Sequence, residues 1–416
     1  MKFGINTLDD FEVKGKTVLL RVDINEPIDK KNERLKDITR IKASERTIRE
    51  LSDRKAKVVI LAHQGSDIEY KNFYSTKPHA KVLTDLLEKP VRFIDDISGP
   101  AAQTEIKKLE KGEILLLDNV RFMSEEQTLF ENNLKLTPQE QAETLLVKKL
   151  APLADIYVCD AFAAAHRSQP SLCGFEQVMP SAMGRLFEEE YSILSRLMGD
   201  PKRPCVFVLG GSKINDAFAM MNSVLSNGIA DKILTGGLVG EVMAWGEHQN
   251  IGKATRAYIK KLGYDNHVDD ARELMRKYRQ KIEIPVDYAC VVEGKRYEVK
   301  MNTIPDSEII LDIGRETVEI YRQEILKAKT IFVNGPMGVF EDIESEYGTQ
   351  MIWDALANTQ GYTVIGGGDS ITATKKYNKV NSINYICTGG GSLIRFLSGE
   401  DLPVIKALRF ATKFNS

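Results

Sequence analysis

Two glycine runs followed by polar residues stand out in the second half of the chain, at 366–370 and 389–392. A phosphate can approach the backbone closely where side chains are absent, and the first turn of a following helix offers unpaired N–H groups and a favourable dipole. We expect Asp369 and Ser370 to cap such a helix. Tight turns also use glycine, because it tolerates positive φ, but a pair of separate triple runs favours phosphate binding. The sequence therefore predicts a nucleotide-phosphate site.

Common nucleotide-binding signatures do not account for these runs. Gly15-Lys16-Thr17 resembles the end of a P-loop, but Asp10 stands where the first glycine belongs, and a strand is expected to follow instead of a helix. No G-x-G-x-x-G motif occurs at an expected strand end, which argues against a dinucleotide-dependent oxidoreductase. A phosphate site of neither type remains.

Basic residues near expected strand ends form a second candidate set in the first half of the chain. The ends of parallel strands gather at one edge of a sheet, so these side chains could converge on a small polyanion. Asp23 and Asn25 would add hydroxyl-recognising groups at the same edge. A single arginine is more often a solvated or ion-paired surface residue, whereas the set predicts a site for an anionic metabolite. Its members are Arg21, Arg40, His63, Arg121, His166 and Arg167.

Short apolar runs recur along the chain and alternate with amphipathic segments such as 216–225 and 318–328. Most of the runs are continuously apolar, as strands covered on both faces must be. This alternation predicts a parallel, doubly wound α/β sheet with ligands at the carboxyl ends of its strands, where the glycines of the second half occur. The expected strands are Thr17–Val22, Lys57–Leu61, Glu113–Leu117, Asp155–Cys159, Cys205–Leu209, Lys232–Thr235, Glu308–Asp312, Thr330–Val333, Tyr362–Ile365 and Asn384–Cys387.

The chain is too long, at 416 residues, for one ordinary core, so two domains are expected. An apolar stripe over Pro180–Asp200, with prolines at 201 and 204 beyond it, predicts one helix, and we place the domain boundary there. The charged segment Lys260–Lys281 is expected to be a solvated surface helix.

Composition describes a globular protein, with 43% hydrophobic and 28% charged residues. A net charge of −2 gives no global signal for nucleic acid or an anionic membrane. The five cysteines are expected to be buried free thiols of a reducing compartment, and neither they nor the five histidines have zinc-site spacing. Without a signal peptide or a membrane-spanning run, a cytoplasmic protein is expected.

Motifs along essentially the whole chain make it resemble the phosphoglycerate kinase family, and the loop details resemble its archaeal branch most. NGPMGVFE at 334–341, followed by GGGDS at 366–370, is highly specific. The resemblance implies two doubly wound parallel-sheet (Rossmann-like) domains joined by a hinge helix. The other matching motifs are RVDINEP from Arg21, Thr39-Arg40, AHQG ending at Gly65, DNVRF ending at Phe122, DAFAAAHR ending at Arg167, GGSK ending at Lys213 and TGGG from Thr388.

The resemblance also implies where the domains and the binding residues lie. A phosphoglycerate-binding domain would cover 1–180, a hinge helix 181–200 and a nucleotide-binding domain 201–394, with a tail from about 395 to 416 packed back on the first domain. By residue matching, substrate groups fall on Asp23, Ile24, Asn25, Arg40, His63, Gln64, Gly65, Ser66, Arg121, His166 and Arg167. Nucleotide groups fall on Gly211, Lys213, Gly236, Asn334, Glu341, Gly366, Gly367, Gly368, Asp369 and Ser370, with Glu341 on the ribose.

The implied activity is reversible transfer of the acyl phosphate of 1,3-bisphosphoglycerate to MgADP, giving 3-phosphoglycerate and MgATP in glycolysis or gluconeogenesis. Such transfer needs in-line placement and charge cancellation more than a general base. The cancelling groups would be Mg²⁺ at Asp369, the side chains of Arg40 and Lys213, and the helix starts after Gly368 and Gly391. We expect Arg40 and Lys213 to meet only when the domains close.

Several positions depart from the family pattern. Ser66 and Asp67 stand where an arginine and a proline are common, and Ala217 stands where most members have a second lysine. Arg315 replaces a common proline, and Met337 fits core packing at least as well as nucleotide contact.

Two alternatives stay open: a nucleotide-dependent dehydrogenase, and a catalytically weakened nucleotide-binding relative, motivated by Ser66 and Ala217. The expected partner is the small-molecule substrate, without nucleic acid or membrane, in a monomer or homodimer.

Overall fold

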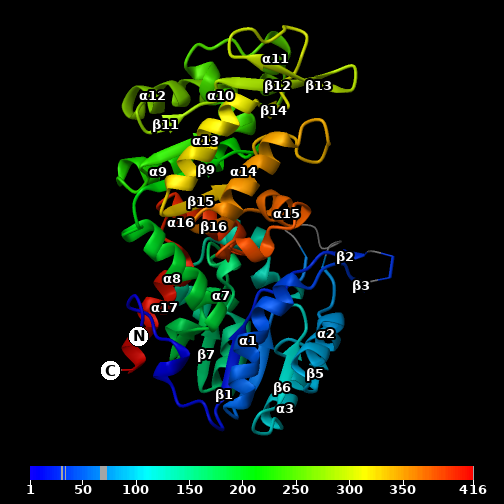
Figure 1. The fold of residues 1–416 in the computed structure, drawn as a ribbon. Coiled ribbons are helices and arrows are strands. Elements are labelled where there is room, and N and C mark those ends of the chain that lie inside the picture. The colour runs from blue at the N-terminus through cyan, green and yellow to red at the C-terminus, as the bar shows by residue number, and fades with distance from the viewer. Residues whose placement is uncertain (30, 33, 66–72, 416) are drawn as a thin grey trace. The chain divides into compact units, whose positions relative to one another are not determined.

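The computed structural model describes residues 1–29, 31–32, 34–65 and 73–415. These residues form two compact units (Figure 1). Unit 1 comprises Met1–Ile193 and Asp401–Ser416, and unit 2 comprises Leu194–Glu400. The predicted substrate group at Ser66 and the departure at Asp67 lie outside the described residues.

Unit 1 is built on a six-stranded sheet in the order β5-β6-β4-β1-β7-β8, and every neighbouring pair is parallel. Strands β1, β4, β6 and β7 are buried along almost their whole length, which explains their continuously apolar sequences. The bounds are β1 Thr17–Arg21, β4 Lys57–Leu61, β5 Val91–Ile94, β6 Ile114–Leu117, β7 Ile156–Cys159 and β8 Ser181–Met183, with a short hairpin of β2 Ile28–Asp29 and β3 Arg34–Leu35.

Helices α1 and α2 cover one face of this sheet. Ile48 and Leu51 of α1 and Leu83 of α2 share a buried cluster with alternate residues of β1, β4 and β6. The helical spacing of these apolar residues makes each helix amphipathic, so each buries one stripe and leaves the other wet. The helices of unit 1 are α1 Thr39–Asp53, α2 Lys77–Leu87, α3 Pro100–Lys107, α4 Thr128–Leu134, α5 Pro138–Ala142, α6 Leu145–Leu150, α7 Pro170–Cys173 and α17 Pro403–Phe410.

Unit 2 has a second six-stranded parallel sheet, in the order β11-β10-β9-β15-β16-β17. The fold class predicted for the chain is therefore confirmed. A separate antiparallel sheet, β13-β12-β14, belongs to the same unit. The bounds are β9 Cys205–Leu209, β10 Lys232–Thr235, β11 Ile282–Glu283, β12 Asp287–Val292, β13 Lys295–Lys300, β14 Asp312–Ile313, β15 Thr330–Asn334, β16 Tyr362–Gly366 and β17 Tyr385–Ile386.

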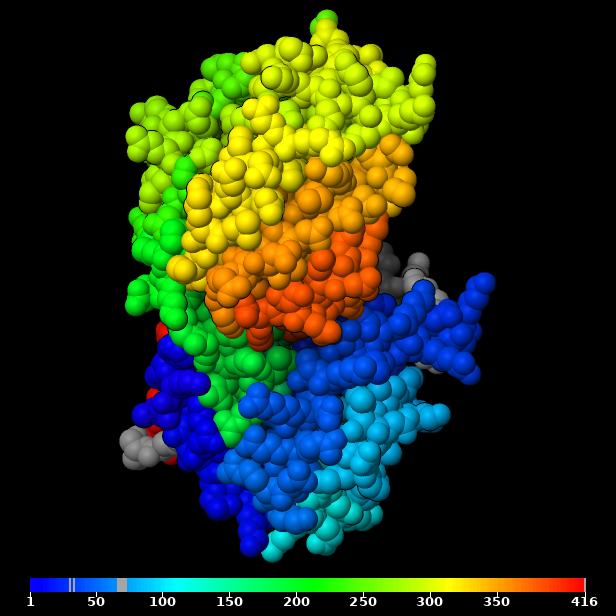
Figure 2. Space-filling model, viewed as in Figure 1, coloured from blue at the N-terminus to red at the C-terminus, as the bar shows by residue number. Residues whose placement is uncertain are grey.

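The core of unit 2 lies between its parallel sheet and helices α13 and α14. Tyr321 of α13 and Trp353 of α14 are buried in a cluster with Val208 of β9 and Val333 of β15. The opposite side of α13 is on the molecular surface, in yellow in Figure 2. The helices of unit 2 are α9 Ile214–Ser226, α10 Gly237–Gly246, α11 Lys253–Lys261, α12 Val268–Tyr278, α13 Arg315–Lys327, α14 Tyr347–Asn358, α15 Gly368–Lys376 and α16 Gly390–Leu397.

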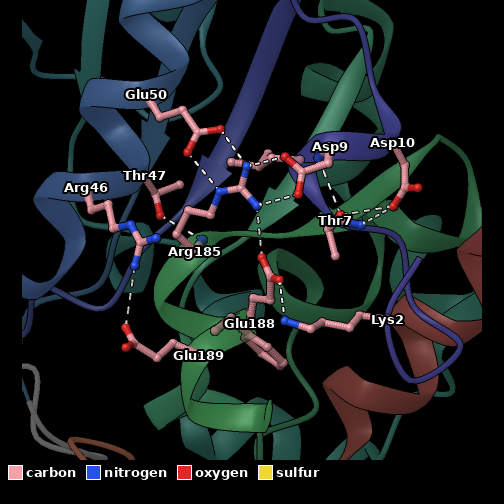
Figure 3. A network of polar contacts seen from close by, with 12 residues as sticks. Lys2, Thr7, Asp9, Asp10, Arg46, Thr47, Glu50, Arg185, Glu188 and Glu189 are labelled. Carbon is pink, nitrogen blue, oxygen red and sulfur yellow. Dashed lines mark hydrogen bonds and ion pairs between the residues drawn. The ribbon is translucent and has the colours of Figure 1, made fainter.

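Helix α8, Arg185–Gly199, begins in unit 1, and the division between the units falls within it, between Ile193 and Leu194. Arg185 is only 13% exposed and forms ion pairs with Asp9 at 2.5 Å, Glu50 of α1 at 2.8 Å and Glu188 at 3.0 Å (Figure 3). Its backbone N–H also donates to the Thr47 hydroxyl at 2.9 Å. The start of α8 is thereby fastened to α1 within unit 1.

Three predicted elements differ from the structure. The segment Pro180–Asp200 is not one helix, because Ser181–Met183 pairs with β7 as strand β8 before α8 begins. The predicted parallel strand Glu308–Asp312 is wrong, since only β14 forms there and it pairs antiparallel with β12. The charged segment Lys260–Lys281 is interrupted, because α11 ends before Gly263, which has a φ of +76°.

All five cysteines are buried and free, as their apolar surroundings predict. In the described part of the chain, no helix is long and apolar enough to cross a membrane.

Candidate functional site

The basic residues of unit 1 converge on His63, which follows β4 and is 7% exposed. Arg21 at the end of β1 is fully buried, and its Nη2 lies 3.1 Å from His63 Nδ1. Burial lowers the pKa of His63 well below its ordinary value, and the charges of Arg21, Arg121, Arg167 and Arg40 lower it further. Four of the predicted arginines therefore carry charges close enough to affect this imidazole, and Arg21 contacts it directly.

The ring of His63 is neutral, and the hydrogen bond with Arg21 determines its tautomer. A guanidinium can only donate, so Nδ1 accepts and the proton remains on Nε2. Arg21 also donates to the Ser171 hydroxyl at 3.0 Å and to the Val22 carbonyl at 2.5 Å. Arg21 thus orients His63 and is itself held on several sides.

Arg40 lies at the first turn of α1 and forms an ion pair with Asp23 just beyond β1. The carboxylate of Glu26 caps the helix by accepting the backbone N–H groups of Arg40 at 2.5 Å and Ile41 at 3.3 Å. Burial raises the pKa of Glu26, while those N–H groups oppose the rise. Glu26 is 4% exposed and sequence reasoning gave it no role, although it lies inside the RVDINEP motif.

The side chain and backbone of Gln64 are occupied by hydrogen bonds within the protein. Its side chain accepts from Glu26 N–H at 3.1 Å, donates to the Glu26 carbonyl at 2.8 Å and contacts His79 Nε2 at 2.9 Å. Asn119, after β6, bonds both the N–H and the carbonyl of Gln64, at 3.0 and 2.7 Å. Gln64 is therefore placed to position Glu26 and α1, and sequence reasoning assigned no role to His79 or to Asn119 of the DNVRF motif.

Gly65 and Asn25 are joined by two hydrogen bonds next to Arg121. The Gly65 N–H donates to Asn25 Oδ1 at 2.9 Å, and the Gly65 carbonyl accepts from Asn25 Nδ2 at 3.3 Å and from Arg121 Nη1 at 3.1 Å. Gly65 has a φ of +103°, which an L side chain rarely adopts. The loop after β4 is thus the point where three predicted substrate residues meet.

The remaining predicted substrate residues of unit 1 differ in their surroundings. Arg167 is about a quarter exposed, donates to Thr128 at 3.1 Å and forms an ion pair with Glu131 at 3.8 Å. His166 is half-buried beside it, after a short 3₁₀ turn. Ile24 is fully buried in the core, so only its backbone can face a ligand.

In unit 2 a cavity of about 130 Å³ opens at the carboxyl ends of β9, β15 and β16. Gly210, Gly335 and Gly367 form part of its wall, where strand ends pass so closely that a Cβ on Gly335 would lie 2.1 Å from the Gly210 carbonyl. Its other lining residues are Gly211, Ser212, Lys213, Asp216, Asn334, Gly368, Asp369, Ser370, Gly390, Gly391 and Ile394. Most of the predicted nucleotide residues are therefore brought together.

The helix after the GGGDS run begins two residues earlier than a cap at Asp369 would give. Gly367, with a φ of +89°, precedes α15, so Asp369 and Ser370 lie inside the first turn instead of capping it. Ser370 is buried and its hydroxyl accepts the Gly335 N–H at 2.7 Å, while Asp369 is exposed at the cavity. At the other run, Gly389 precedes α16 and Ser392 likewise lies within the helix.

Some predicted nucleotide residues do not line this cavity among the described residues. Gly236 precedes α10 and packs against Met337, whose sulfur would lie 2.6 Å from a Cβ there. Met337 itself is fully buried in the core, so the packing role holds. Gly366 and Glu341 are also outside the lining, with Gly366 buried and Glu341 exposed.

Sequence reasoning missed Asp216, which lines the cavity from the first turn of α9. Ala217 beside it is 6% exposed and packs in the core. The departure at Arg315 also has a structural account, because its guanidinium stacks over Tyr347 at 4.3 Å and pairs with Glu298 at 3.2 Å. A carboxylate three residues after Lys213, on the same side of a helix, is the signal that could have identified Asp216.

Two parallel α/β units, one with converging arginines and one with a glycine-walled cavity, define the chain as an enzyme of the phosphoryl-transfer class. The family model described as phosphoglycerate kinase matches residues 8–400. The chain belongs to the phosphoglycerate kinase family.

Full-length relatives agree with this assignment. The phosphoglycerate kinase of Methanothermobacter thermautotrophicus is 45% identical over 408 residues, covering 98% of this chain and 97% of the relative. That of Methanothermus fervidus is 45% identical over 411 residues, covering 99% and 98%. The predicted resemblance to archaeal members is confirmed.

Solved structures of the family have the same fold. The crystal structure of phosphoglycerate kinase from Pyrococcus horikoshii OT3 gives a TM-score of 0.88 at 39% identity, covering 99% of this chain and all of that one. The structure from Coxiella burnetii gives 0.82 at 29% identity, covering 97% and 98%. The chain is accordingly a phosphotransferase with a carboxyl group as acceptor, which uses a nucleotide and 3-phosphoglycerate, and the dehydrogenase alternative is set aside.

Proposed function

We propose that unit 1 binds 3-phosphoglycerate or 1,3-bisphosphoglycerate and that unit 2 binds the nucleotide, with the acyl phosphate passing to MgADP. The observation that carries this proposal is the cavity of unit 2, whose wall combines glycine backbone with Lys213, Asp216 and Asp369. Backbone N–H groups without covering side chains, together with a lysine, suit phosphate oxygens. Core packing alone does not require such a set of residues around a cavity.

In unit 1 the arginines are proposed to bind the anionic groups of the substrate, and His63 to donate a neutral hydrogen bond from Nε2. Arg40 is 37% exposed, whereas Arg121 is 1% exposed and anchored on the Gly65 carbonyl. We therefore assign Arg40 to the phosphate that is transferred and the buried Arg121 to fixed recognition. Asp23 holds Arg40 in place, and Asn25 positions the Gly65 loop.

The phosphoryl step breaks the bond between phosphorus and the acyl oxygen and forms a bond from a β-phosphate oxygen of ADP to the same phosphorus. The electron pair of the broken bond stays on the carboxylate of 3-phosphoglycerate. A carboxylate is a good leaving group, so no general base is needed, and catalysis consists of placement and charge cancellation. Because the phosphoryl group must contact both ligand sets, the proposal includes closure of the units during transfer.

The residues of the unit 2 cavity fit a magnesium nucleotide. Asp216 and Asp369 present carboxylate oxygens at one cavity, and Mg²⁺ prefers oxygen ligands and usually binds through one or two carboxylates plus substrate phosphates. When bound, the ion would neutralise charge on the phosphate oxygens. Gly368 is the first residue of α15 and Gly391 lies in the first turn of α16, and both line the cavity, where the absence of a side chain keeps the wall open.

The test is Lys213→Ala in a coupled assay of ATP formation from 1,3-bisphosphoglycerate. The side chain of Lys213 is exposed and has no hydrogen bond or ion pair within the described residues, so its removal should leave the fold intact. We expect kcat to fall about 10²-fold or more, as for loss of one charge-stabilising contact. Lys253→Ala is the control, because Lys253 is 82% exposed and pairs only with Asp306 at the surface.

A Lys213→Ala enzyme within a few-fold of wild-type kcat would refute the proposed role. Nucleotide binding without any ATP formation in the wild type would instead favour the catalytically weakened relative. Running the assay with ADP and with GDP identifies the preferred nucleotide. We also propose a cytoplasmic location, and a monomer or homodimer, which sedimentation of the purified protein distinguishes.

A further inference from the structure

His267 of unit 2 contacts the helix that carries Lys213, although His267 belongs to the charged segment predicted to be only a solvated surface. It lies at the junction between a short 3₁₀ turn and α12. Its Nε2 is 2.5 Å from Asn215 Oδ1 on the first turn of α9, and its ring packs on Phe218 one turn further, with centroids 5.4 Å apart. The histidine side chain is 15% exposed.

The first turn of α9 has two functional sides. Lys213 and Asp216 line the glycine-walled cavity, whereas Asn215 and Phe218 face His267. Residues three apart share one side of a helix, so both pairs follow from helical geometry. A shift of Asn215 would therefore move Lys213 and Asp216 with it.

On its apolar side this turn is packed by Ile214, Ala217 and Phe218, which are buried, whereas its start has little polar fastening. Lys213 precedes α9 and gives it no side-chain cap, so the helix lacks the usual fastening at its start. The Oδ2 atom of Asp270, one turn along α12, lies 2.9 Å from His267 Nδ1, and this contact orients the ring with Nε2 toward Asn215. The chain of contacts thus runs from α12 through the ring to the turn that holds the cavity lysine.

We propose that His267 is a positioning residue for nucleotide use, which holds the first turn of α9 so that Lys213 and Asp216 face the nucleotide phosphates. The proposal rests on the role of Lys213 given above. His267 does not line the cavity and touches no substrate, so its effect must pass through Asn215.

The experiment compares His267→Ala, His267→Gln and Arg272→Ala in the full-length enzyme. Arg272 is the matched control, because it also lies on α12 but forms an ion pair with Asp269 at the surface. The Arg272 side chain is 45% exposed and the Asp269 side chain is 86% exposed. We expect His267→Ala to raise KM for ADP about tenfold, because one hydrogen bond that orders the first turn of α9 is lost. KM for 1,3-bisphosphoglycerate should stay unchanged. His267→Gln keeps a polar group that can hydrogen-bond Asn215, and it should recover most of the ADP affinity.

A double variant tests the route of the effect. If His267 acts through α9, adding His267→Ala to Lys213→Ala should cause little further loss, whereas independent roles would multiply. Equal changes in both KM values, or no change in His267→Ala, would overturn the proposal. If Lys213→Ala lowers kcat strongly but His267→Ala leaves KM for ADP unchanged, only this inference about His267 is refuted. A silent Lys213→Ala would remove the proposed function itself.

Discussion

The two proposed ligand-binding regions differ in the chemical groups that form them. In unit 1 the candidate groups are side chains that hold one another: Arg21 and His63, Gln64 and Asn119, Gly65 and Asn25. In unit 2 the wall is mainly backbone, with glycines from several strand ends brought together. A side-chain network can be broken by removing one functional group, whereas a glycine wall is spoiled by adding one.

The contrast extends to electrostatics. In unit 1, burial and then the charges of four arginines lower the pKa of His63, and two of those arginines, Arg21 and Arg121, are themselves buried. The charged residues that line the unit 2 cavity, Lys213, Asp216 and Asp369, are exposed or half-exposed. We therefore propose that unit 1 binds its ligand partly with arginines that are already desolvated, whereas unit 2 keeps its charges in water until a ligand arrives.

The largest expected effect follows from breaking the network of unit 1 at Arg21. Arg21→Met removes the donor to His63 and the positive charge beside Glu126, whose pKa burial raises and Arg21 lowers. Arg21 also donates to the Ser171 hydroxyl and the Val22 carbonyl, and each buried acceptor left unpaired costs about 1 to 3 kcal/mol, so we expect a total loss of about 3 to 5 kcal/mol. Urea denaturation should show a loss of that size, and Arg272→Met should show almost none. A loss below about 1 kcal/mol would mean that the network is not structurally required.

Much of the fold could be predicted from sequence, and the exceptions have a common cause. Strands β4, β9 and β10 form at the predicted residues, because each is a continuous apolar run ended by a turn. Strand β8 was missed because its partner β7 is distant in sequence and only the pairing makes Ser181–Met183 extended.

The sites follow the same pattern. The glycine runs and the converging arginines could be recognised because residue type alone limits what they can do. Glu26, Asn119 and His79 could not, since their roles depend on which backbone groups the tertiary structure places opposite them. Asp369 and Ser370 were predicted to cap their helix, but the cap is Gly367, two residues before Asp369, because Gly367 is the residue with the nonhelical backbone.

A smaller effect is expected from pH, acting on His79 behind the unit 1 site. Burial lowers the pKa of His79 from 6.5 to about 4, and its Nε2 contacts Gln64. The unfolded chain therefore takes up a proton near pH 6.5 while the folded chain does not. This contribution is fully present above pH 6.5 and is lost as pH falls toward 4.

His79→Gln removes that proton uptake. Between pH 7 and pH 4 the free energy of unfolding of the wild type should fall by about 3 kcal/mol more than that of His79→Gln, at 1.36 kcal/mol per pH unit. Urea denaturation at a series of pH values measures the difference, in which all other titrations cancel. Parallel curves for the two proteins would show that His79 does not carry the acid sensitivity.

The smallest effects on stability, yet large ones on binding, are expected at two neighbouring glycines of unit 2. Gly367 has a φ of +89° and a Cβ there would lie 2.9 Å from Asn334 Nδ2, whereas nothing lies within 4 Å of a Cβ on Gly368. Gly367→Ala should cost about 2 kcal/mol through backbone strain. Gly368→Ala should leave stability unchanged or raise it by about 0.5 kcal/mol, because alanine restricts the unfolded chain.

Both glycines line the cavity, so both methyl groups should weaken ADP binding, measured by titration calorimetry, about tenfold or more. Gly368→Ala is the informative member of the pair, because its stability is intact and any loss of affinity must come from occupied space. If Gly368→Ala bound ADP as tightly as the wild type, the phosphates would not approach this part of the backbone. The proposal that unit 2 binds its ligand mainly through glycine backbone would then be contradicted at Gly368, where the test is most direct.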